Sequence, residues 1–219
     1  MGSDKIHHHH HHMWHIFERF VNEYERWFLV HRFAYLSELQ AVKCLLPEGR
    51  GVEIGVGTGR FAVPLKIKIG VEPSERMAEI ARKRGVFVLK GTAENLPLKD
   101  ESFDFALMVT TICFVDDPER ALKEAYRILK KGGYLIVGIV DRESFLGREY
   151  EKNKEKSVFY KNARFFSTEE LMDLMRKAGF EEFKVVQTLF KHPSELSEIE
   201  PVKEGYGEGA FVVIRGTKK

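Results

Sequence analysis

The sequence Val52-Glu53-Ile54-Gly55-Val56-Gly57-Thr58-Gly59-Arg60 joins a short apolar run to three glycines at alternate positions. The apolar run predicts a buried strand. Glycine tolerates positive φ and has no Cβ, so the backbone of the loop can approach a ligand closely. The next apolar segment, residues 67–71, is followed by the acidic residue Glu72. A glycine loop and a carboxylate at the tip of the next strand together indicate a nucleoside site, in which the carboxylate accepts hydrogen bonds from ribose hydroxyls.

The spacing of the glycines separates two classes of nucleotide-binding protein. A dinucleotide-binding loop has the pattern Gly-x-Gly-x-x-Gly, and its last glycine would fall at position 60, where Arg60 stands. A nicotinamide oxidoreductase is therefore the least favoured interpretation. With Glu53 before the loop and Glu72 after it, the sequence resembles the class I S-adenosylmethionine (SAM) dependent methyltransferases. The resemblance is to their small-molecule, single-domain type with a type 11 methyltransferase domain, whereas the loop alone also fits a sharp structural turn without a ligand.

Length, charge and cysteine content restrict the class of protein further. Residues 1–12 contain six consecutive histidines and are predicted to be an expression tag, so we expect residues 13–219 to form a single methyltransferase domain. The 35 Lys and Arg residues against 33 Asp and Glu residues leave a net charge of +2, which does not favour nucleic acid as a partner. The two distant cysteines, Cys44 and Cys113, argue against a disulfide framework or a zinc cluster. With no signal-peptide pattern and no membrane-spanning apolar run, we expect a cytoplasmic protein that does not bind membranes.

Strands and helices alternate from residue 51 onward, which predicts an α/β fold with a largely parallel sheet covered by helices on both faces. Residues 183–190 and 210–215 have no long helix between them and are expected to pair antiparallel. The resemblance implies a Rossmann-like, seven-stranded, mostly parallel sheet that ends in this C-terminal antiparallel hairpin. The other expected strands are residues 52–55, 67–71, 86–89, 105–110 and 134–140. The expected helices are residues 59–65, residues 74–83, the segment from Pro118 to Gly132-Gly133, and the segment from the capping box Ser167-Thr168-Glu169-Glu170 to Gly179.

Residues 14–46 carry apolar side chains at helical spacing and predict one broken helix or two consecutive helices before Pro47. The first half of this segment is rich in aromatic residues. Packing of this face against the sheet or another subunit is the simpler interpretation, and both a monomer and a homodimer are compatible with it. The resemblance offers a second interpretation, in which residues 13–46 form a helical lid over the substrate and residues 47–219 form the Rossmann-like core.

In an open α/β sheet the ligand lies beyond the carboxyl ends of the strands, where the strand order reverses. The resemblance places SAM there, with its methionine and ribose portions against Gly55, Gly57 and Gly59. It also implies that Glu53 orients the loop and the amino group of SAM, directly or through water, and that Glu72 accepts from both ribose hydroxyls. The further predicted cofactor-binding residues are Pro73, Met77, Thr92, Ala93, Glu94, Val109 and Thr110.

Three of these assignments have competing interpretations. Met77 either packs on the adenine face or belongs to the ordinary core of its helix. Thr92 stands where members of the family commonly have an aspartate that accepts from the adenine amino group, so the adenine contact is expected to be weaker. Thr110 would end a strand whose carbonyls accept from the cofactor, but threonine is also a common strand residue.

Methyl transfer from a sulfonium to a nucleophile is an in-line displacement, in which positioning and desolvation supply much of the catalysis. A base is required only if the acceptor arrives protonated, and the sequence identifies no catalytic residue. His15, His31 and His192 have no metal-ligand spacing, so no metal site is expected. The residues predicted on the substrate side are Trp27, Phe114, Arg142, Tyr150, Tyr160 and Tyr206.

The sequence therefore predicts a SAM-dependent methyltransferase that acts on an unidentified small-molecule acceptor. An RNA or protein methyltransferase is one alternative, for which the balanced charge gives no support. A noncatalytic module that binds SAM or another nucleoside is the other. The departure at Thr92 and the lack of an evident base leave this second alternative open.

Overall fold

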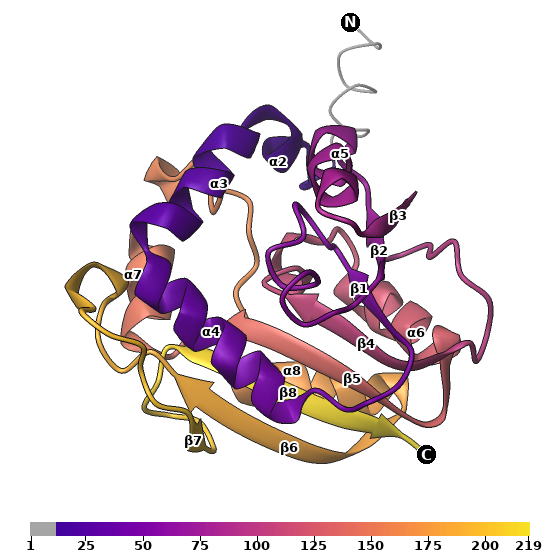
Figure 1. Cartoon of the computed structure of the whole chain (residues 1–219). Helices are drawn as coiled ribbons and strands as arrows, with labels where there is room; N and C mark the ends of the chain where they lie inside the picture. The colour runs from indigo at the N-terminus through magenta and orange to yellow at the C-terminus, as the bar shows by residue number, and fades with distance from the viewer. Residues whose placement is uncertain (1–11) are drawn as a thin grey trace, which may run out of the picture.

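The computed structural model describes residues 12–219, so the predicted expression tag lies outside the described residues except for His12. One eight-stranded sheet organises the chain, with strand order β3-β2-β1-β4-β5-β8-β6-β7 (Figure 1). The strands are β1 Gly51–Ile54, β2 Ile69–Glu72, β3 Phe87–Lys90, β4 Phe103–Val109, β5 Leu129–Val140, β6 Phe180–Thr188, β7 Lys203–Glu204 and β8 Phe211–Lys218. The α-helices are α2 His15–Arg19, α3 Val21–Val30, α4 Arg32–Leu45, α5 Glu75–Lys83, α6 Pro118–Ile128, α7 Phe145–Lys152 and α8 Thr168–Ala178.

The sheet confirms the predicted fold class. Strand β1 pairs parallel with β2 and with β4, and β8 lies antiparallel between β5 and β6. The short strand β7 at the edge adds an eighth strand to the seven that were predicted. The strand order reverses between β1 and β4, and in such a sheet ligands bind beyond the carboxyl ends of the strands at this point.

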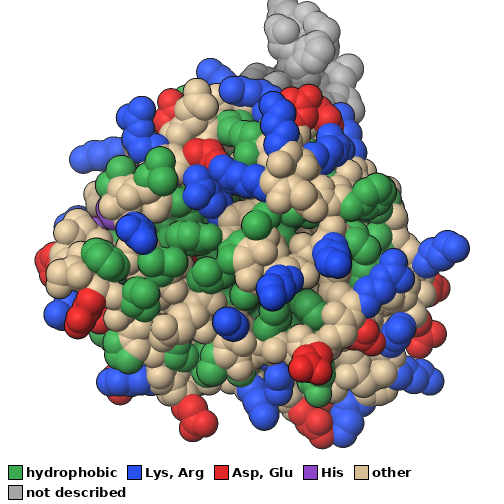
Figure 2. Space-filling model, in the orientation of Figure 1, with side chains coloured by type: hydrophobic (Ala, Val, Ile, Leu, Met, Phe, Trp, Pro, Cys, Tyr) green, Lys and Arg blue, Asp and Glu red, His purple; other side chains and the backbone are tan. Residues whose placement is uncertain are grey.

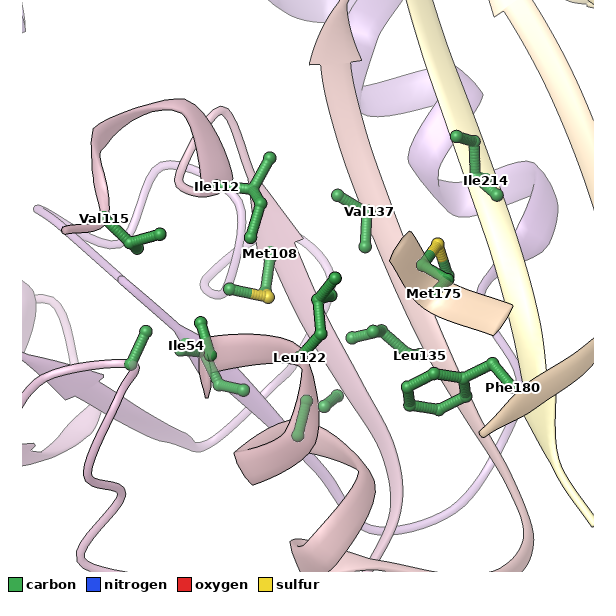
Figure 3. Close-up of a cluster of buried hydrophobic side chains, with 14 of the residues drawn as sticks. Ile54, Met108, Ile112, Val115, Leu122, Leu135, Val137, Met175, Phe180 and Ile214 are labelled. Carbon is green, nitrogen blue, oxygen red and sulfur yellow. The ribbon is translucent and has the colours of Figure 1, made fainter. Parts of the chain in front are cut away.

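The side chains of β4 alternate between the two faces of the sheet and contribute to two hydrophobic clusters. Phe105, Leu107 and Val109 belong to the cluster that contains the buried residues of α4 and α5. Ala106 and Met108 belong to the cluster that contains the buried residues of α6 and α8 (Figure 3). Figure 1 shows α4 crossing in front of the sheet, with α6 and α8 behind it. The central strands are apolar on both faces because both faces are covered.

The N-terminal segment forms three helices rather than the one or two that its periodicity predicts. The breaks fall at Phe20 and His31, which lie outside helical geometry with ψ of 41° and 50°. Helix α4 packs on β6 and β8, whereas α2 contacts α5 at the other end of the sheet. The first two helices therefore reach over the ends of the parallel strands while the third belongs to the body of the fold.

The helix predicted over residues 59–65 does not form, and the segment is a series of turns. Pro64 has no N–H to donate to the carbonyl of Arg60, as an α-helix would require. The hydroxyl of Tyr35 in α4 donates to that carbonyl instead. Lys66 then adopts a positive φ of 61°, which is incompatible with continued helix.

The predicted helix end at Gly132 is also wrong, because α6 ends at Ile128 and the glycine lies within β5. The ammonium group of Lys218 donates to the carbonyls of Tyr126 and Leu129 at 2.8 and 2.7 Å. These bonds satisfy carbonyl groups at the helix end without a glycine cap. Gly132 instead takes φ of +83° where the register between β4 and β5 shifts, so its flexibility serves a strand irregularity.

Leu122 of α6 is fully buried and extends toward the sheet in Figure 3. Leu122→Ala should lower the free energy of unfolding by about 2–5 kcal/mol, because it leaves a cavity in a packed core. Urea denaturation measures this change. Lys123→Ala, at the exposed next position of the same helix, is the control and should change stability by less than about 0.5 kcal/mol. Equal effects of the two substitutions would contradict the packing described.

Candidate active site

A cavity lies at the carboxyl ends of β1, β2 and β4, where the strand order predicts it. Figure 1 shows α2 and α3 arching over this end of the sheet, with α5 alongside. We call residues 15–30, which form α2 and α3, the N-terminal cover. Most of the predicted cofactor residues line the cavity: Gly55, Gly57, Glu72, Pro73, Met77, Thr92, Ala93, Glu94, Val109 and Thr110. Glu53 and Gly59 do not line it.

Glu72 connects the glycine loop to the beginning of α5. Its carboxylate accepts hydrogen bonds from the Gly57 N–H at 2.8 Å and from the Ser74 N–H at 3.0 Å. Gly57 has φ of +57°, and a Cβ there would lie 3.3 Å from the hydroxyl of Tyr24, so the turn favours glycine. Burial raises the pKa of Glu72 to about 7, although the two N–H groups act to lower it. The carboxylate retains lone pairs that can accept from a ribose.

Glu53 is buried at the end of β1 and has an exposed fraction of only 2%. Its Oε1 atom has no hydrogen-bond partner among residues 12–219. Burial raises the pKa of Glu53 well above its ordinary value, against the lowering effect of the Ala62 N–H. A buried acceptor without a partner fits a donor from outside the chain. The ammonium group of SAM, reached directly or through water, is such a donor, so these residues fit the cofactor.

Glu25 of α3 fastens the N-terminal cover to the glycine loop. Its carboxylate accepts from the Thr58 hydroxyl at 2.9 Å, from Arg60 Nε at 3.1 Å and from Arg84 Nη2 at 2.5 Å. Burial acts to raise the pKa of Glu25, but hydrogen bonds from Arg60, Arg84 and Thr58 outweigh it and the pKa is lowered. Arg60, which occupies the position of the third dinucleotide-loop glycine, therefore holds the cover in place.

Glu18 of α2 makes a second attachment, to the beginning of α5. Its carboxylate accepts from the Ser74 hydroxyl at 2.9 Å and from the Arg76 N–H at 3.0 Å. The Arg76 guanidinium donates in return to the Glu18 carbonyl at 2.8 Å. The Ser74 N–H also donates to Glu72 on the cavity wall. Ser74 therefore links the N-terminal cover to Glu72.

The part of the cavity away from the glycine loop has an aromatic wall, which we call the acceptor half. Phe17 of the cover packs edge-on against Phe114, with ring centroids 4.7 Å apart. Tyr160 stacks on Tyr150 at 4.5 Å and lies 5.4 Å from Phe165. Segments far apart in the sequence therefore enclose one apolar space. Of the predicted substrate residues, Trp27, Phe114, Tyr150 and Tyr160 line the cavity.

The other two predicted substrate residues, Arg142 and Tyr206, lie elsewhere. Arg142 forms an ion pair with Glu170 of α8, which raises the pKa of the guanidinium. The hydroxyl of Tyr206 donates to Glu169 at 3.0 Å on the outside of the same helix end. Arg142, directly after β5, thus turns toward α8, and Tyr206 lies in the loop after β7, so neither side chain lines the cavity.

Two residues of the wall, Tyr24 and Glu38, were not predicted as site residues. Tyr24 lies in the aromatic first half of residues 14–46, and burial raises the pKa of its hydroxyl. Glu38 has an exposed fraction of 6%, and burial raises its pKa to about 8. The sequence does carry a signal for Glu38, because it falls on the helix face shared with the fully buried residues Ala34, Ala41 and Val42. A carboxyl group buried on such a face costs free energy, which indicates a functional role.

The family model described as a methyltransferase domain matches residues 52–137. The chain is 49% identical over 203 residues to the uncharacterized protein MJ1123 of Methanocaldococcus jannaschii, which covers 93% of this chain and 98% of that protein. It is 30% identical over 149 residues to 2-methyl-6-phytyl-1,4-hydroquinone methyltransferase 2 of Oryza sativa, across 62% of this chain and 40% of the rice protein. A Haloferax volcanii methyltransferase, solved in complex with the Trm112 methyltransferase activator, has the same fold. That comparison gives a TM-score of 0.65 at 18% identity, across 90% of this chain and 97% of the other.

A glycine loop and an acidic strand tip at the switch point of a parallel sheet define a nucleoside-cofactor-binding α/β protein. Residues 52–137 carry the methyltransferase domain, so the chain is a SAM-dependent methyltransferase with the class I fold, and SAM is its cofactor. The predicted family, enzyme class and cofactor are thereby confirmed. Between residues 12 and 219, no helix combines the length and apolar character needed to cross a membrane. The same residues contain no cluster of His, Cys, Asp and Glu side chains arranged to hold a metal ion.

Glu25→Ala removes the acceptor of three side-chain donors and should loosen the N-terminal cover. We expect amide hydrogen exchange in α3 to become faster by about tenfold, which corresponds to roughly 1.4 kcal/mol of lost contacts. Mass spectrometry of peptides from Val21–Val30 measures this. Arg26→Ala, at an exposed position of the same helix, is the control.

The effect of Glu25→Ala should also depend on pH. The pKa of Glu25 in the folded chain is lowered from 4.5, so its contribution is present above pH 4.5 and is lost as the pH falls through the folded pKa. The difference between the two chains should therefore shrink in acid. A difference that is unchanged in acid would mean that the Glu25 carboxylate does not hold the cover.

Proposed function

We propose that this methyltransferase transfers the methyl group of SAM to an apolar small molecule held in the acceptor half. The observation that carries the proposal is that one cavity extends from the glycine loop to the aromatic residues Phe114, Tyr150 and Tyr160 under the N-terminal cover. An apolar pocket with few polar groups is typical of small-molecule sites. A small molecule can be enclosed in this way, whereas a strand of RNA or a protein segment needs an open groove.

The cofactor half of the cavity supports specific roles for its residues. Bound SAM supplies an electrophilic methyl group on a cationic sulfur, so the chain has to hold an acceptor in line and exclude water. We propose that Glu72 accepts from the ribose hydroxyls and that Glu53 serves the amino group. Thr92 and Ala93 lie on the cavity wall where the adenine is expected. Met77 is buried in α5 and also lines the cavity. It can therefore belong to the helix core and pack on the adenine face.

The proposed lid comprises only the N-terminal cover and not the whole of residues 13–46. Helix α4 carries fully buried residues and packs on β6 and β8, so it is part of the core of the fold. Helix α3 buries Val21 and Phe28, and the other attachments of α2 and α3 are the polar contacts of Glu18 and Glu25 and aromatic packing. Polar contacts to loops open at lower cost than a packed core. We propose that residues 15–30 open to exchange ligands and close for transfer.

Two alternatives remain for the experiment to decide. A macromolecular acceptor receives little support from the face of the molecule drawn in Figure 2, where acidic and basic side chains are interspersed. Calorimetric titration with SAM, S-adenosylhomocysteine and NAD tests the cofactor site. Incubation with methyl-labelled SAM and a metabolite extract then tests transfer. Binding of SAM without labelling of any small molecule would favour a noncatalytic module, and labelling of RNA or protein would favour a macromolecular acceptor.

Glu72→Ala should weaken SAM binding by about 1–3 kcal/mol, or roughly 5- to 150-fold, through loss of charge-assisted hydrogen bonds to the ribose. Titration calorimetry gives the change in Kd. Glu79→Ala, an exposed position on α5, is the matched control and should leave Kd unchanged. A folded Glu72→Ala chain with unaltered affinity would place the ribose elsewhere.

A further inference from the structure

Glu38 is a carboxyl group without a partner on the wall of the acceptor half. It is 6% exposed, and within residues 12–219 it forms neither a hydrogen bond nor an ion pair. Burying an unpaired carboxyl group costs free energy, so packing alone would favour an apolar residue here, as at the neighbouring positions Ala34 and Val42. A polar side chain that the fold does not use is available to a ligand.

Five carboxyl groups line the cavity. They are Glu23, Glu38, Glu72, Glu94 and Asp116. In the described part of the chain, no Lys, Arg or His lines the cavity. The whole chain has a net charge of +2, so the acidic lining is a local property of the site. Such a wall repels a carboxylate or a phosphate and attracts a cation.

Aromatic side chains surround Glu38 within the same wall. Its charge acts on the hydroxyls of Tyr24, Tyr150 and Tyr160 and raises the pKa of each, after the larger effect of burial. These groups come from α3, from α7 and from the segment after α7. The faces of aromatic rings attract ammonium groups, most strongly where water is excluded.

We propose that the methyl acceptor is a hydrophobic primary or secondary amine whose ammonium group binds Glu38 within this aromatic wall. The inference rests on the proposed function, because it names the substrate class of the same cavity. Glu38 then has two tasks. Its carboxylate pairs with the ammonium group, and it also accepts the proton that must leave nitrogen before the nitrogen can act as a nucleophile.

The transfer balances as follows. One ammonium proton moves to a Glu38 carboxylate oxygen and leaves a lone pair on nitrogen. The lone pair forms the N–C bond to the methyl carbon of SAM while the C–S bond breaks, and the electron pair of that bond stays on sulfur. The methylated product is again a cation, and the proton on Glu38 passes to solvent when the product leaves.

The test uses the whole chain saturated with S-adenosylhomocysteine and three probes of one shape: 2-phenylethylamine, 2-phenylethanol and phenylacetate. The amine should bind at least about tenfold more tightly than the alcohol, and the carboxylate should bind most weakly. Glu38→Gln should abolish the preference for the amine and leave S-adenosylhomocysteine binding unchanged. Glu79→Gln, on the exposed face of α5, should behave as the unmodified chain.

Proton release supplies a readout that a purely structural residue would not affect. Burial raises the pKa of Glu38 to about 8, so without a cation the carboxyl group is mostly protonated at pH 7. Binding of the ammonium group should release most of one proton, measured by calorimetry in buffers of different ionisation enthalpy. The Glu38→Gln chain should release none.

The stability of Glu38 variants separates the inference from a structural role. A carboxyl pKa raised from 4.5 to about 8 destabilises the fold increasingly as pH rises through that range. Glu38→Gln and Glu38→Met should therefore unfold at the same temperature as the unmodified chain at pH 4.5, and at a higher temperature at pH 8. Destabilisation of both variants at pH 8 would show that Glu38 serves the fold and would overturn the inference.

Three binding results would also overturn it. They are equal binding of the amine and the alcohol, binding of none of the three probes, and a Glu38→Gln chain that keeps both amine preference and proton release. Failure to bind S-adenosylhomocysteine is distinguishable from these, because it would overturn the proposed function itself.

Discussion

Glu38, Glu53 and Glu72 are buried at one end of the sheet, and none of the three forms an ion pair with another of residues 12–219. Burial raises the pKa of each, because the charged form loses hydration that no cation replaces. Three such groups lower the stability of the fold. Destabilising groups of this kind are typical of functional sites, where activity requires them. SAM carries a sulfonium and an ammonium group against one carboxylate, so the cofactor supplies positive charge to a site that lacks it.

The carboxylates of the N-terminal cover show the opposite arrangement. Glu25 accepts from the guanidinium groups of Arg60 and Arg84, and Glu18 accepts from the Arg76 N–H and the Ser74 hydroxyl. The positive charges of this region are therefore used outside the cavity, where they hold the cover against the glycine loop and α5. The cover shields Glu38 and Glu72 on the cavity wall from solvent, which strengthens their electrostatic interactions.

The sequence predicted those parts of the structure that depend on neighbouring residues. The capping box at Ser167 forms as expected, because the Ser167 hydroxyl accepts from the Glu170 N–H three residues away. The errors involve long-range partners, although Pro64 itself is a local signal against a helix. The failure of the helix near Pro64 involves a hydroxyl from α4, and the end of α6 is satisfied by Lys218 from the last strand. No local pattern reveals such partners.

The same distinction applies to the site. The family match covers residues 52–137, which contain the glycine loop, Glu72 and the predicted adenine contacts. The acceptor half is built mainly by residues outside that range, such as Phe17, Glu38, Tyr150 and Tyr160. These residues are brought together only when the N-terminal helices and the chain after β5 close on the sheet. The cofactor could therefore be predicted from a contiguous motif. The acceptor depends on a cavity assembled from both ends of the chain. The sequence indicated four of its aromatic residues, Trp27, Phe114, Tyr150 and Tyr160, but not Glu38 on the otherwise buried face of α4.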